Sequence, residues 1–400
     1  MKIISRTIIV LSFVSFFTDV ASEMLYPVMP LYLKHIGFSI VFIGILEGIA
    51  EGLSGISKAY FGKWSDVIGK RMPFVRIGYL LSAISRPMMV VFIHPIWVFF
   101  ARSTDRLGKG IRTSARDALL SDESTKENKA KVFGFHRSMD TFGAVLGPSL
   151  ALLYLYFYPE HYKELFLLAF VPGLIAVLLT YFIKEKTLAN QIHSKISFIE
   201  FFKYWKASNQ QFKSPVIGFL MFALINSSDV FLLLKAKESG ISDQMVIGLY
   251  ILYNFTYAVA AYPLGALADK IGLKYVYAFG LSLFAIVYFC LGLTTNVTFI
   301  VLLFAVYGIF SAATEGISKA WISKAVHKHE TATAIGTYSS FQSVFTLISS
   351  IVAGIIWFNW SGKALMIITG IVTAGIAIYF LFVQEKGIDS ERISGLKHEH

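Results

Sequence analysis

The chain has 400 residues, of which 56% are hydrophobic and only 15% are charged, and its mean hydropathy is +0.63. Soluble globular domains carry about 25% charged residues, so the composition excludes a soluble protein and predicts an integral membrane protein. The formal net charge of +11 does not indicate a nucleic-acid partner, because that function needs basic residues gathered on one soluble face. The single Cys290 allows no disulfide within the chain.

Hydrophobic runs of about 20 residues, the length that crosses a bilayer as a helix, recur along the whole sequence. They predict an all-α membrane protein with twelve transmembrane helices. The predicted spans are 7–33, 41–62, 72–94, 96–117, 131–157, 163–183, 215–236, 243–267, 272–294, 297–323, 332–358 and 361–384. The first run lacks a small-residue cleavage site, so we expect a retained helix rather than a removed signal peptide.

The longest polar segment lies between the sixth and seventh spans and divides them six and six. Part of it, ISFIEFFKYWK, alternates aromatic residues with Lys203 and Lys206, which fits an amphipathic helix on the membrane surface or a solvated linker. The predicted organisation is a helix bundle over 1–183, a cytoplasmic linker over 184–214, a second bundle over 215–384 and a cytoplasmic tail over 385–400.

Lysine and arginine concentrate in alternate loops, which the positive-inside rule places in the cytoplasm. Both termini then lie on the cytoplasmic side of a multi-pass protein of the cytoplasmic (inner or plasma) membrane. The basic residues assigned to these loops are Lys63, Lys70, Arg71, Arg112, Arg116, Lys126, Lys129, Lys131, Lys184, Lys186, Lys270, Lys274, Lys324 and Lys328.

The two halves carry related sequences. GKWSDVIGKR, with Gly62 and Asp66, returns as GALADKIGLK, in which Gly265 and Asp269 take the matching places 203 positions later. The repeat predicts two pseudo-symmetric six-helix bundles related by an axis along the membrane normal. Transporters with this arrangement hold a mid-membrane site between halves that rock.

At these residues the chain resembles the major facilitator superfamily of secondary transporters, over essentially its whole length. The loop after the second span is similar to the family's signature loop at Gly62, Asp66, Gly69, Lys70 and Arg71, and the second half carries a weaker copy. The resemblance implies that the loop steadies the outward-facing state. Physically, the glycines permit a tight turn, and the aspartate can dock against a neighbouring helix N-terminus.

The stretch GFHRSMDTFGAVLGP resembles the family's fifth-helix motif at Gly134, Gly143, Gly147 and Pro148. In the family this motif is associated with antiporters, which export a solute against an inward flow of protons. Its small residues also allow close helix packing. The residues we assign to gating are Gly62, Asp66, Gly69, Arg71, Gly143, Gly147, Pro148, Gly265 and Asp269.

Ionisable residues inside the spans are numerous in the first half and few in the second. Several first-half pairs are four positions apart and therefore share a helix face: Asp19/Glu23, Glu47/Glu51, Arg102/Arg106 and His136/Asp140. Each such group costs about 2.5 to 3.5 kcal/mol in hydrocarbon, so these faces are expected to turn inward and meet. Six acids against four arginines leave two carboxylates unpaired.

An unpaired carboxylate in a low dielectric takes up a proton. We therefore predict that Asp19, Glu23 and Asp140 carry protons, with His136 as a relay. Arg137 is expected to form a structural ion pair with Asp140, in a cytoplasmic-side network that links the fifth helix to the first or fourth.

Helices 1 and 4 line the central cavity in the resembled family, which implies a substrate role for Arg102 and Arg106. Guanidinium groups favour carboxylate or phosphate groups, although Asp19 and Glu23 could absorb both charges. The second half adds four polar residues to the predicted substrate cavity, Asn226, Asp229, Glu315 and Lys319. Helix 3 is peripheral in the family, which implies that Arg86 forms a structural ion pair with Glu47 and Glu51.

The sequence has no nucleotide-binding loop, no paired-cysteine zinc spacing and no enzyme site, so we expect no cofactor and no bound metal. The leading hypothesis is a monomeric, proton-coupled secondary transporter that exports a small organic solute by proton antiport and alternating access. Proton-coupled uptake of an organic anion is an alternative, as is export of a divalent metal on Asp19, Glu23 and Asp229. A membrane scaffold or sensor is disfavoured, because it gains nothing from charges inside the membrane.

Overall fold

The structure is a computed structural model that describes residues 4–26, 28–29, 32–33, 36–38, 40–185 and 200–383. The helices before the linker, which we call the first half, are α1 (Arg6–Glu23), α3 (Ile40–Ile68), α4 (Met72–Val91), α5 (Pro95–Asp122), α6 (Lys129–Phe157) and α7 (Tyr162–Leu179), followed by the short η1 (Thr180–Phe182). Next comes α8 (Glu200–Ala207). The second half comprises α9 (Gln210–Ala223), α10 (Val230–Glu238), α11 (Asp243–Ile271), α12 (Leu273–Leu293), α13 (Val297–Lys324), η2 (Lys328–Glu330), α14 (Thr331–Asn359) and α15 (Gly362–Phe382).

The molecule is an all-helical membrane protein, as predicted. Among the described residues, eight helical segments are long and apolar enough to cross a membrane. Helix α5 lies outside this set because of its many charged residues, and α9 because it has only 14 residues. The first predicted span, 7–33, is longer than α1, which ends at Glu23, and parts of the stretch that follows lie outside the described residues.

The seventh predicted span, 215–236, is not one helix. The structure divides it into α9 and α10, and Asn226 and Ser227 lie in the break. Asparagine and serine are weaker helix formers than the alanine and leucine around them, which favours an interruption here. The break is also tied to its neighbours, because Ser228 N–H donates to Ser350 Oγ at 3.2 Å and Asp229 accepts hydrogen bonds from α11 and α13.

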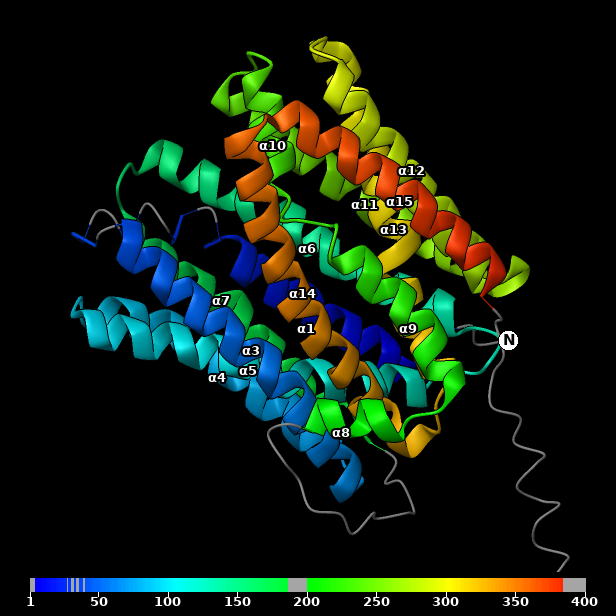
Figure 1. The fold of residues 1–400 in the computed structure, drawn as a ribbon. Helices are drawn as coiled ribbons and strands as arrows, with labels where there is room; N and C mark the ends of the chain where they lie inside the picture. Colours follow the sequence, from blue (N-terminus) through cyan, green and yellow to red (C-terminus); the bar gives the residue numbers. More distant parts are fainter. Residues whose placement is uncertain are drawn as a thin grey trace, which may run out of the picture.

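The helices form two groups with the contacts between halves at their junction. In Figure 1, α3, α4, α5 and α7 lie together, α11, α12, α13 and α15 form the other group, and α1, α6 and α14 lie between them. Two helix pairs carry most of the packing between the halves, α3 against α14 and α6 against α11. These pairs are counterparts under the sequence repeat, which makes the interface pseudo-symmetric.

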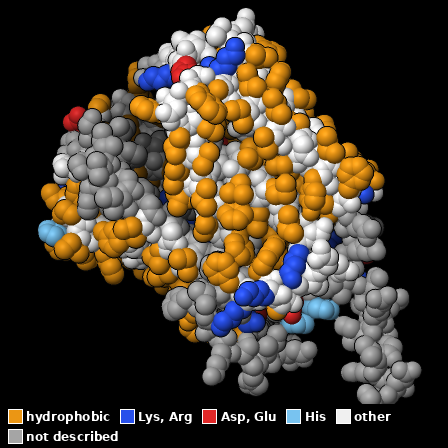
Figure 2. Space-filling model, viewed as in Figure 1, with side chains coloured by type: hydrophobic (Ala, Val, Ile, Leu, Met, Phe, Trp, Pro, Cys, Tyr) orange, Lys and Arg blue, Asp and Glu red, His pale blue; other side chains and the backbone are white. Residues whose placement is uncertain are grey.

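Apolar side chains cover the outside of the molecule. Figure 2 shows hydrophobic residues over most of the visible face, with lysine and arginine near its two ends. Phe358 of α14 is 89% exposed and Phe382 of α15 is 81% exposed. Such a surface suits lipid tails, and its basic ends suit the polar headgroups.

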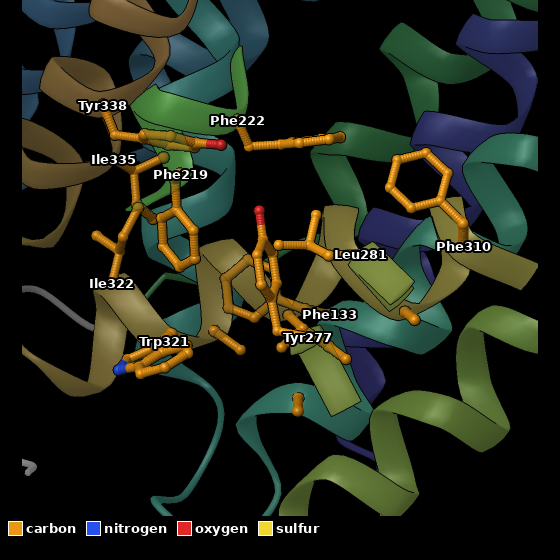
Figure 3. Packing of buried hydrophobic residues seen from close by; sticks show 14 of the residues in the cluster. Phe133, Phe219, Phe222, Tyr277, Leu281, Phe310, Trp321, Ile322, Ile335 and Tyr338 are labelled. Carbon is orange, nitrogen blue, oxygen red and sulfur yellow. The ribbon is translucent and has the colours of Figure 1, made fainter. Parts of the chain in front are cut away.

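An aromatic cluster fills the second half. The ring of Phe219 lies 4.8 Å from that of Tyr277, 5.8 Å from Trp321 and 5.6 Å from Tyr338, measured between centroids. Figure 3 shows these residues together with Phe133, which comes from α6 of the first half and is buried in the same cluster. Helix α6 therefore contributes to the core of the opposite half.

Helix α8 packs on the protein, which neither hypothesis for the linker anticipated. Its Trp205 ring lies 5.7 Å from that of Phe341 in α14, and Tyr204 OH donates to Glu330 at 3.4 Å. The helix thus lies against the start of α14 at the cytoplasmic end. Residues 186–199 of the predicted linker, and the predicted tail 385–400, fall outside the described residues.

Two arginines assigned to a cytoplasmic loop are instead buried within a helix. Helix α5 continues to Asp122, so Arg112 and Arg116 lie inside it, 6% and 8% exposed. The positive-inside rule counts basic residues near a span end but does not show whether the helix continues through them.

Candidate functional site

A cavity of about 350 Å³, which we call the central cavity, lies between the two halves. Its walls come from α1, α3, α5 and α6 on one side and from α11, α13 and α14 on the other. The predicted site residues that line it are Asp19, Glu23, Arg137, Asp140, Glu315 and Lys319. The structure therefore brings the charged residues of α1 and α6 together with those of α13.

Four basic residues of this lining were not among the predicted site residues: Lys58, Lys109, Arg112 and Arg116. Three of them continue a pattern begun by the predicted pair Arg102 and Arg106. The five basic residues of α5 follow one another at spacings of four, three, three and four positions, which places them along one helix face. This periodicity is the sequence signal that could have found them.

A buried ion pair joins α13 to α5 beside the cavity. Lys319 Nζ lies 2.6 Å from Asp117 Oδ2, and Asp117 is fully buried. Arg116 lies 2.9 Å from the other oxygen of Asp117 and 3.9 Å from Asp140. Asp117 was not among the predicted site residues, because it is the last residue of a predicted span. A carboxylate at that position is expected to be solvated.

A second connection runs from Asp140 to the second half. Arg137 lies 2.6 Å from Asp140 and 2.8 Å from Glu315 on α13, and its Nε donates to Tyr257 OH on α11 at 2.6 Å. The predicted Arg137–Asp140 pair is thus present, and Arg137 also bridges the two halves. Together with the preceding contacts it forms what we call the ion-pair chain: Lys319, Asp117, Arg116, Asp140, Arg137 and Glu315.

We predicted a link from the fifth helix to the first or the fourth, and Asp140 contacts both. Ser15 Oγ of α1 donates a hydrogen bond to Asp140, and Arg116 donates to the same Ser15 hydroxyl at 3.0 Å. Asp19, one turn further along α1, faces Asp140, Glu23 and Arg116. Two carboxylates from different helices therefore meet at the wall of the central cavity.

His136 shares its helix face with Asp140 but does not line the central cavity. Its Nδ1 lies 3.4 Å from Ser12 Oγ, and its side chain is only 3% exposed. Among the described residues, its Nε2 has no hydrogen-bond partner. The histidine thus lies behind Asp140, between α6 and the cytoplasmic part of α1.

Arg102 and Arg106 line a different space from the one predicted. They face a pocket of about 80 Å³ inside the first half, which we call the first-half pocket, and they are not among the lining residues of the central cavity. Asp105 lies 3.6 Å from Arg102. Both arginines lie about one to four turns further from the cytoplasm than the α5 residues that line the central cavity, and so they reach the narrower space.

Arg86 also faces the first-half pocket. Its Nη2 donates to Ser22 of α1 at 3.4 Å, and its guanidinium lies against Gly173 of α7. The predicted pairing of Arg86 with Glu47 and Glu51 stays a prediction, since the side chains of these two glutamates lie outside the described residues.

Asn226 and Asp229, at the break between α9 and α10, line a cavity of about 210 Å³ within the second half. Asp229 accepts hydrogen bonds from Tyr253 OH at 3.0 Å and from Tyr307 OH at 2.7 Å. Asn226 and Asp229 thus face a space that is lined mainly by second-half residues and adjoins the central cavity, rather than the central cavity itself. This space shares Arg137 and Glu315 with the central cavity.

The first copy of the repeated loop closes the cytoplasmic side against α14. Asp66 accepts hydrogen bonds from the backbone N–H and hydroxyl of Thr333 and pairs with Arg71. The carboxylate therefore docks on a helix N-terminus, as the sequence suggested. Gly62 packs on the backbone of Ala332, where a side chain would collide, and Gly69 has a φ of +70°, which favours glycine.

The second copy of the loop makes the matching contact with α6. Asp269 accepts from the backbone N–H groups of Ala130 and Lys131 at 3.2 and 2.7 Å, and Lys324 lies 3.1 Å away. Gly265 packs directly on the backbone of Ala130. The loop lacks a counterpart of Arg71, but Lys324 of α13 supplies the missing cation. Together, the two docked loops form what we call the cytoplasmic gate.

Asp122, at the cytoplasmic end of α5, belongs to the same region. Its carboxylate lies 3.5 Å from Arg71 and is 14% exposed. Burial raises the pKa of Asp122 to about 6, because desolvation of the charged form outweighs the attraction of Arg71.

The glycines of the fifth-helix motif pack α6 closely against α1. A Cβ on Gly143 would lie 2.5 Å from the carbonyl oxygen of Phe16, and one on Gly147 would lie 2.6 Å from that of Val20. Pro148 follows within the same helix. This close approach sets Asp140 of α6 beside Asp19 of α1.

The chain matches the family model described as the Major Facilitator Superfamily over residues 11–248 and 216–398. It is 34% identical over 360 residues to an uncharacterised MFS-type transporter of Methanocaldococcus jannaschii, covering 88% of this chain and 89% of that protein. The quinolone resistance protein NorA of Staphylococcus aureus is 27% identical over 146 residues, which is 36% of this chain and 37% of NorA.

Solved structures share the fold at low sequence identity. The human organic anion transporter MFSD10 (TETRAN) aligns with a TM-score of 0.78 and 14% identity, covering 94% of this chain and 99% of that one. The Escherichia coli fucose:proton symporter FucP aligns with a TM-score of 0.78 and 12% identity, covering 94% and 98%. At identities this low, the comparison shows a shared fold and nothing about the solute.

Proposed function

Because this chain belongs to the major facilitator superfamily of transporters, we propose that it couples proton movement to the export of a small organic solute, by proton antiport and alternating access. The proposal includes two rocking bundles over residues 1–183 and 215–384. The observation that carries it is the meeting of two carboxylates, Asp19 and Asp140, at the wall of a cavity that lies between the halves.

The two carboxylates repel each other, and a proton held between them relieves that repulsion. Asp140 is also a member of the ion-pair chain that connects the halves. A proton taken up by Asp19 replaces its repulsion of Asp140 with a hydrogen bond, and so alters the charge balance around the carboxylate that pairs with Arg137. Arg137 in turn pairs with Glu315 across the interface, so protonation at the cavity acts on a contact between the halves.

Export is favoured over uptake by the partial likeness to NorA, whose name describes quinolone resistance. The alternative of divalent metal export is weaker, because Asp229 faces the second-half cavity and is bound by two tyrosines, whereas Asp19 and Glu23 face the central cavity. The three acids proposed as metal ligands therefore do not line one space.

The test uses protein reconstituted into vesicles that contain a pH-sensitive dye. A solute is first identified by the thermal stabilisation that it gives the purified protein, since a ligand at 100 times its Kd adds about 2.7 kcal/mol. Solute added outside then makes the vesicle interior more alkaline under antiport and more acidic under symport. Solute uptake without any pH change would refute proton coupling.

The first prediction concerns Asp19. Asp19→Asn removes the ionisable group but keeps its shape, so we expect it to abolish the solute-driven pH change. The unfolding temperature should stay close to that of the unchanged protein, and the Kd for the solute should stay within about twofold. Glu164→Gln, which neutralises an exposed acid of α7 outside the cavity, is the matched control. Unaltered proton movement in Asp19→Asn would remove this residue from the mechanism and direct attention to Glu23.

A further inference from the structure

The first-half pocket has the size of a chemical group rather than of a whole solute. Its volume is about 80 Å³, and its walls come from α1, α4, α5 and α7. By this measure a water molecule needs about 10 to 15 Å³. The pocket therefore has room for a carboxylate or phosphate group with some water, but not for an organic molecule as well.

The lining of this pocket carries a surplus of positive charge. Five of its residues are basic and three are acidic. The basic residues are Arg86, Arg102, Arg106, Lys109 and Arg112, and the acidic residues are Asp19, Glu23 and Asp105. With the acids ionised, the lining has a net charge of two positive units. A low-dielectric space with this balance attracts an anion.

Among the described residues, three of the basic residues have no carboxylate within ion-pair distance: Arg86, Lys109 and Arg112. Arg86 and Arg112 are 4% and 6% exposed, yet their hydrogen bonds go to the hydroxyl groups of Ser22 and Ser82. Arg112 also lies over the ring of Tyr79 at 4.7 Å. Buried guanidinium groups are normally paired with an anion, because an unpaired buried charge is costly.

Close helix packing fixes the position of Arg112. A Cβ on Gly78 of α4 would lie 2.6 Å from the carbonyl oxygen of Gly108, and one on Gly108 of α5 would lie 2.6 Å from that of Gly78. The two backbones therefore touch one turn from Arg112, which brings its guanidinium to Ser82 on α4. A charged group held in this way is preorganised for a ligand.

The pocket opens toward the central cavity. Asp19, Glu23, Lys109 and Arg112 line both spaces. Lys109 is exposed at this boundary, so its ammonium group is available to a ligand that enters from the cavity. One molecule can thus place a small head in the pocket and its larger body in the central cavity.

We propose that the first-half pocket binds the anionic head of the transported solute, a carboxylate or phosphate group held by Arg86, Lys109 and Arg112. Guanidinium groups match the two oxygens of such a head, and Lys109 adds a point charge at the entrance. The inference rests on the proposed transport function and names its substrate class as organic anions. The body of the solute is left to the central cavity.

Binding of the head group alone is measured with small anions on the purified full-length protein. Thermal unfolding is followed in sodium phosphate, sodium acetate and sodium chloride at matched ionic strength, over a range of concentrations. We expect phosphate, acetate or both to stabilise the protein above chloride and to saturate. The acetate and phosphate arms then distinguish a carboxylate head from a phosphate head.

Variants separate this site from general salt effects, because phosphate strengthens apolar burial in any protein. Lys109→Gln is expected to raise the apparent Kd of the stabilising anion at least tenfold, and Arg112→Lys to raise it by less because the charge remains. Lys363→Gln, which removes an exposed lysine of α15 far from the pocket, is expected to keep the apparent Kd within twofold.

The proposal is overturned if no anion stabilises the unchanged protein above chloride, or if Lys109→Gln and Lys363→Gln respond alike. These outcomes do not depend on proton movement. Saturable anion binding that is lost in Lys109→Gln, together with solute uptake that moves no protons, would support the pocket while refuting the proposed coupling.

Discussion

At the scale of single residues, Asp140 is the most highly connected acid of the site. It accepts a hydrogen bond from Ser15 on α1, lies 3.9 Å from Arg116 on α5, and pairs with Arg137 at 2.6 Å within its own helix. Its side chain is largely buried, so its charge is compensated almost entirely by these neighbours. Asp140 therefore stabilises the first half and, through Arg137, its contact with Glu315 in the second.

The second prediction tests this pairing by a double-mutant cycle. Asp140→Ala removes a buried carboxylate from Arg137 and Arg116, which keep only Glu315 and Asp117, and should destabilise the protein by about 3 to 5 kcal/mol. The double change Arg137→Ala/Asp140→Ala should recover only part of this loss, because Arg116 still lacks Asp140. The free energies of unfolding come from denaturant titration in detergent, and strict additivity of the two single changes would contradict the pairing.

The third prediction concerns Asp122 and pH. In the closed gate the pKa of Asp122 is about 6, and exposure on opening would return it toward its ordinary value of 3.8. The closed state therefore binds the proton more tightly, and raising the pH from about 5 to about 7 lowers the free energy needed to open the cytoplasmic side. Asp122→Asn should remove this part of the pH dependence, which is measured as the change with pH in the distance between spin labels at positions 70 and 270.

Which residues the sequence could reveal depends on how far helix periodicity reaches. The shared face of His136 and Asp140 followed from their spacing, which left open whether this face meets helix 1 or helix 4. The bonds of Arg137 to Tyr257 and Glu315 did not follow from spacing. They join residues 120 and 178 positions apart, respectively, and depend on how the two halves close. Such contacts belong to one conformation of the molecule rather than to a local pattern.

At the scale of elements, α6 uses its small residues on two sides. Gly143 and Gly147 pack against α1 within the first half, whereas Gly134 packs against Ala261 and Gly265 of α11 in the second half. One helix therefore forms a permanent contact with its own half and a contact with the other half that must separate when the cytoplasmic side opens.

The fourth prediction follows from this difference. Gly134→Leu places a side chain where the backbone of Ala261 lies, so it should hold the halves apart and favour the inward-open state with little loss of stability. Gly147→Leu, the same change on the other side of α6, should instead lower the unfolding temperature, because the carbonyl of Val20 belongs to its own bundle. Thermal unfolding is measured for both variants, together with the distance between spin labels at positions 70 and 270 on the two docked loops. Similar behaviour of the two variants would contradict the division of roles.

The helix order and the boundaries of most elements followed from hydrophobic run length. The exceptions have local causes: the polar residues Asn226 and Ser227 lie where the seventh span is broken, and Arg112 and Arg116, which were assigned to a loop, lie inside α5, where Asp117 and Asp140 neutralise Arg116. Neutralisation by a partner on another helix has no signal in a single span, so hydropathy places such residues at a boundary.

At the scale of the whole molecule, the sequence repeat appears again as a symmetric closure. Asp66 of the first half docks on the start of α14, and Asp269 of the second half docks on the start of α6. Lys319–Asp117 and Arg137–Glu315 add two ion pairs between the halves nearer the cavity. The structure is therefore closed on the cytoplasmic side, and all four contacts must separate before the cavity opens inward.

The fifth prediction addresses this closure with the two docking aspartates. A carboxylate at a helix N-terminus contributes about 0.3 to 2 kcal/mol, so Asp66→Asn and Asp269→Asn should each raise the ratio of open to closed molecules several-fold. Because each carboxylate has one partner helix and one cation, we expect effects of similar size. In the double variant, the ratio of open to closed molecules should rise by about the product of the two single fold-changes.

The most direct test of alternating access is the distance between spin labels at positions 70 and 270, exposed lysines in the two docked loops, in a Cys290→Ser background. Double electron–electron resonance on reconstituted protein should show a major short distance that corresponds to the closed gate and a minor longer one. The longer population should grow in Asp66→Asn/Asp269→Asn and stay unchanged in Glu164→Gln. A single, unchanged short distance in the double variant would contradict the account, because the gate would then not be held by these contacts.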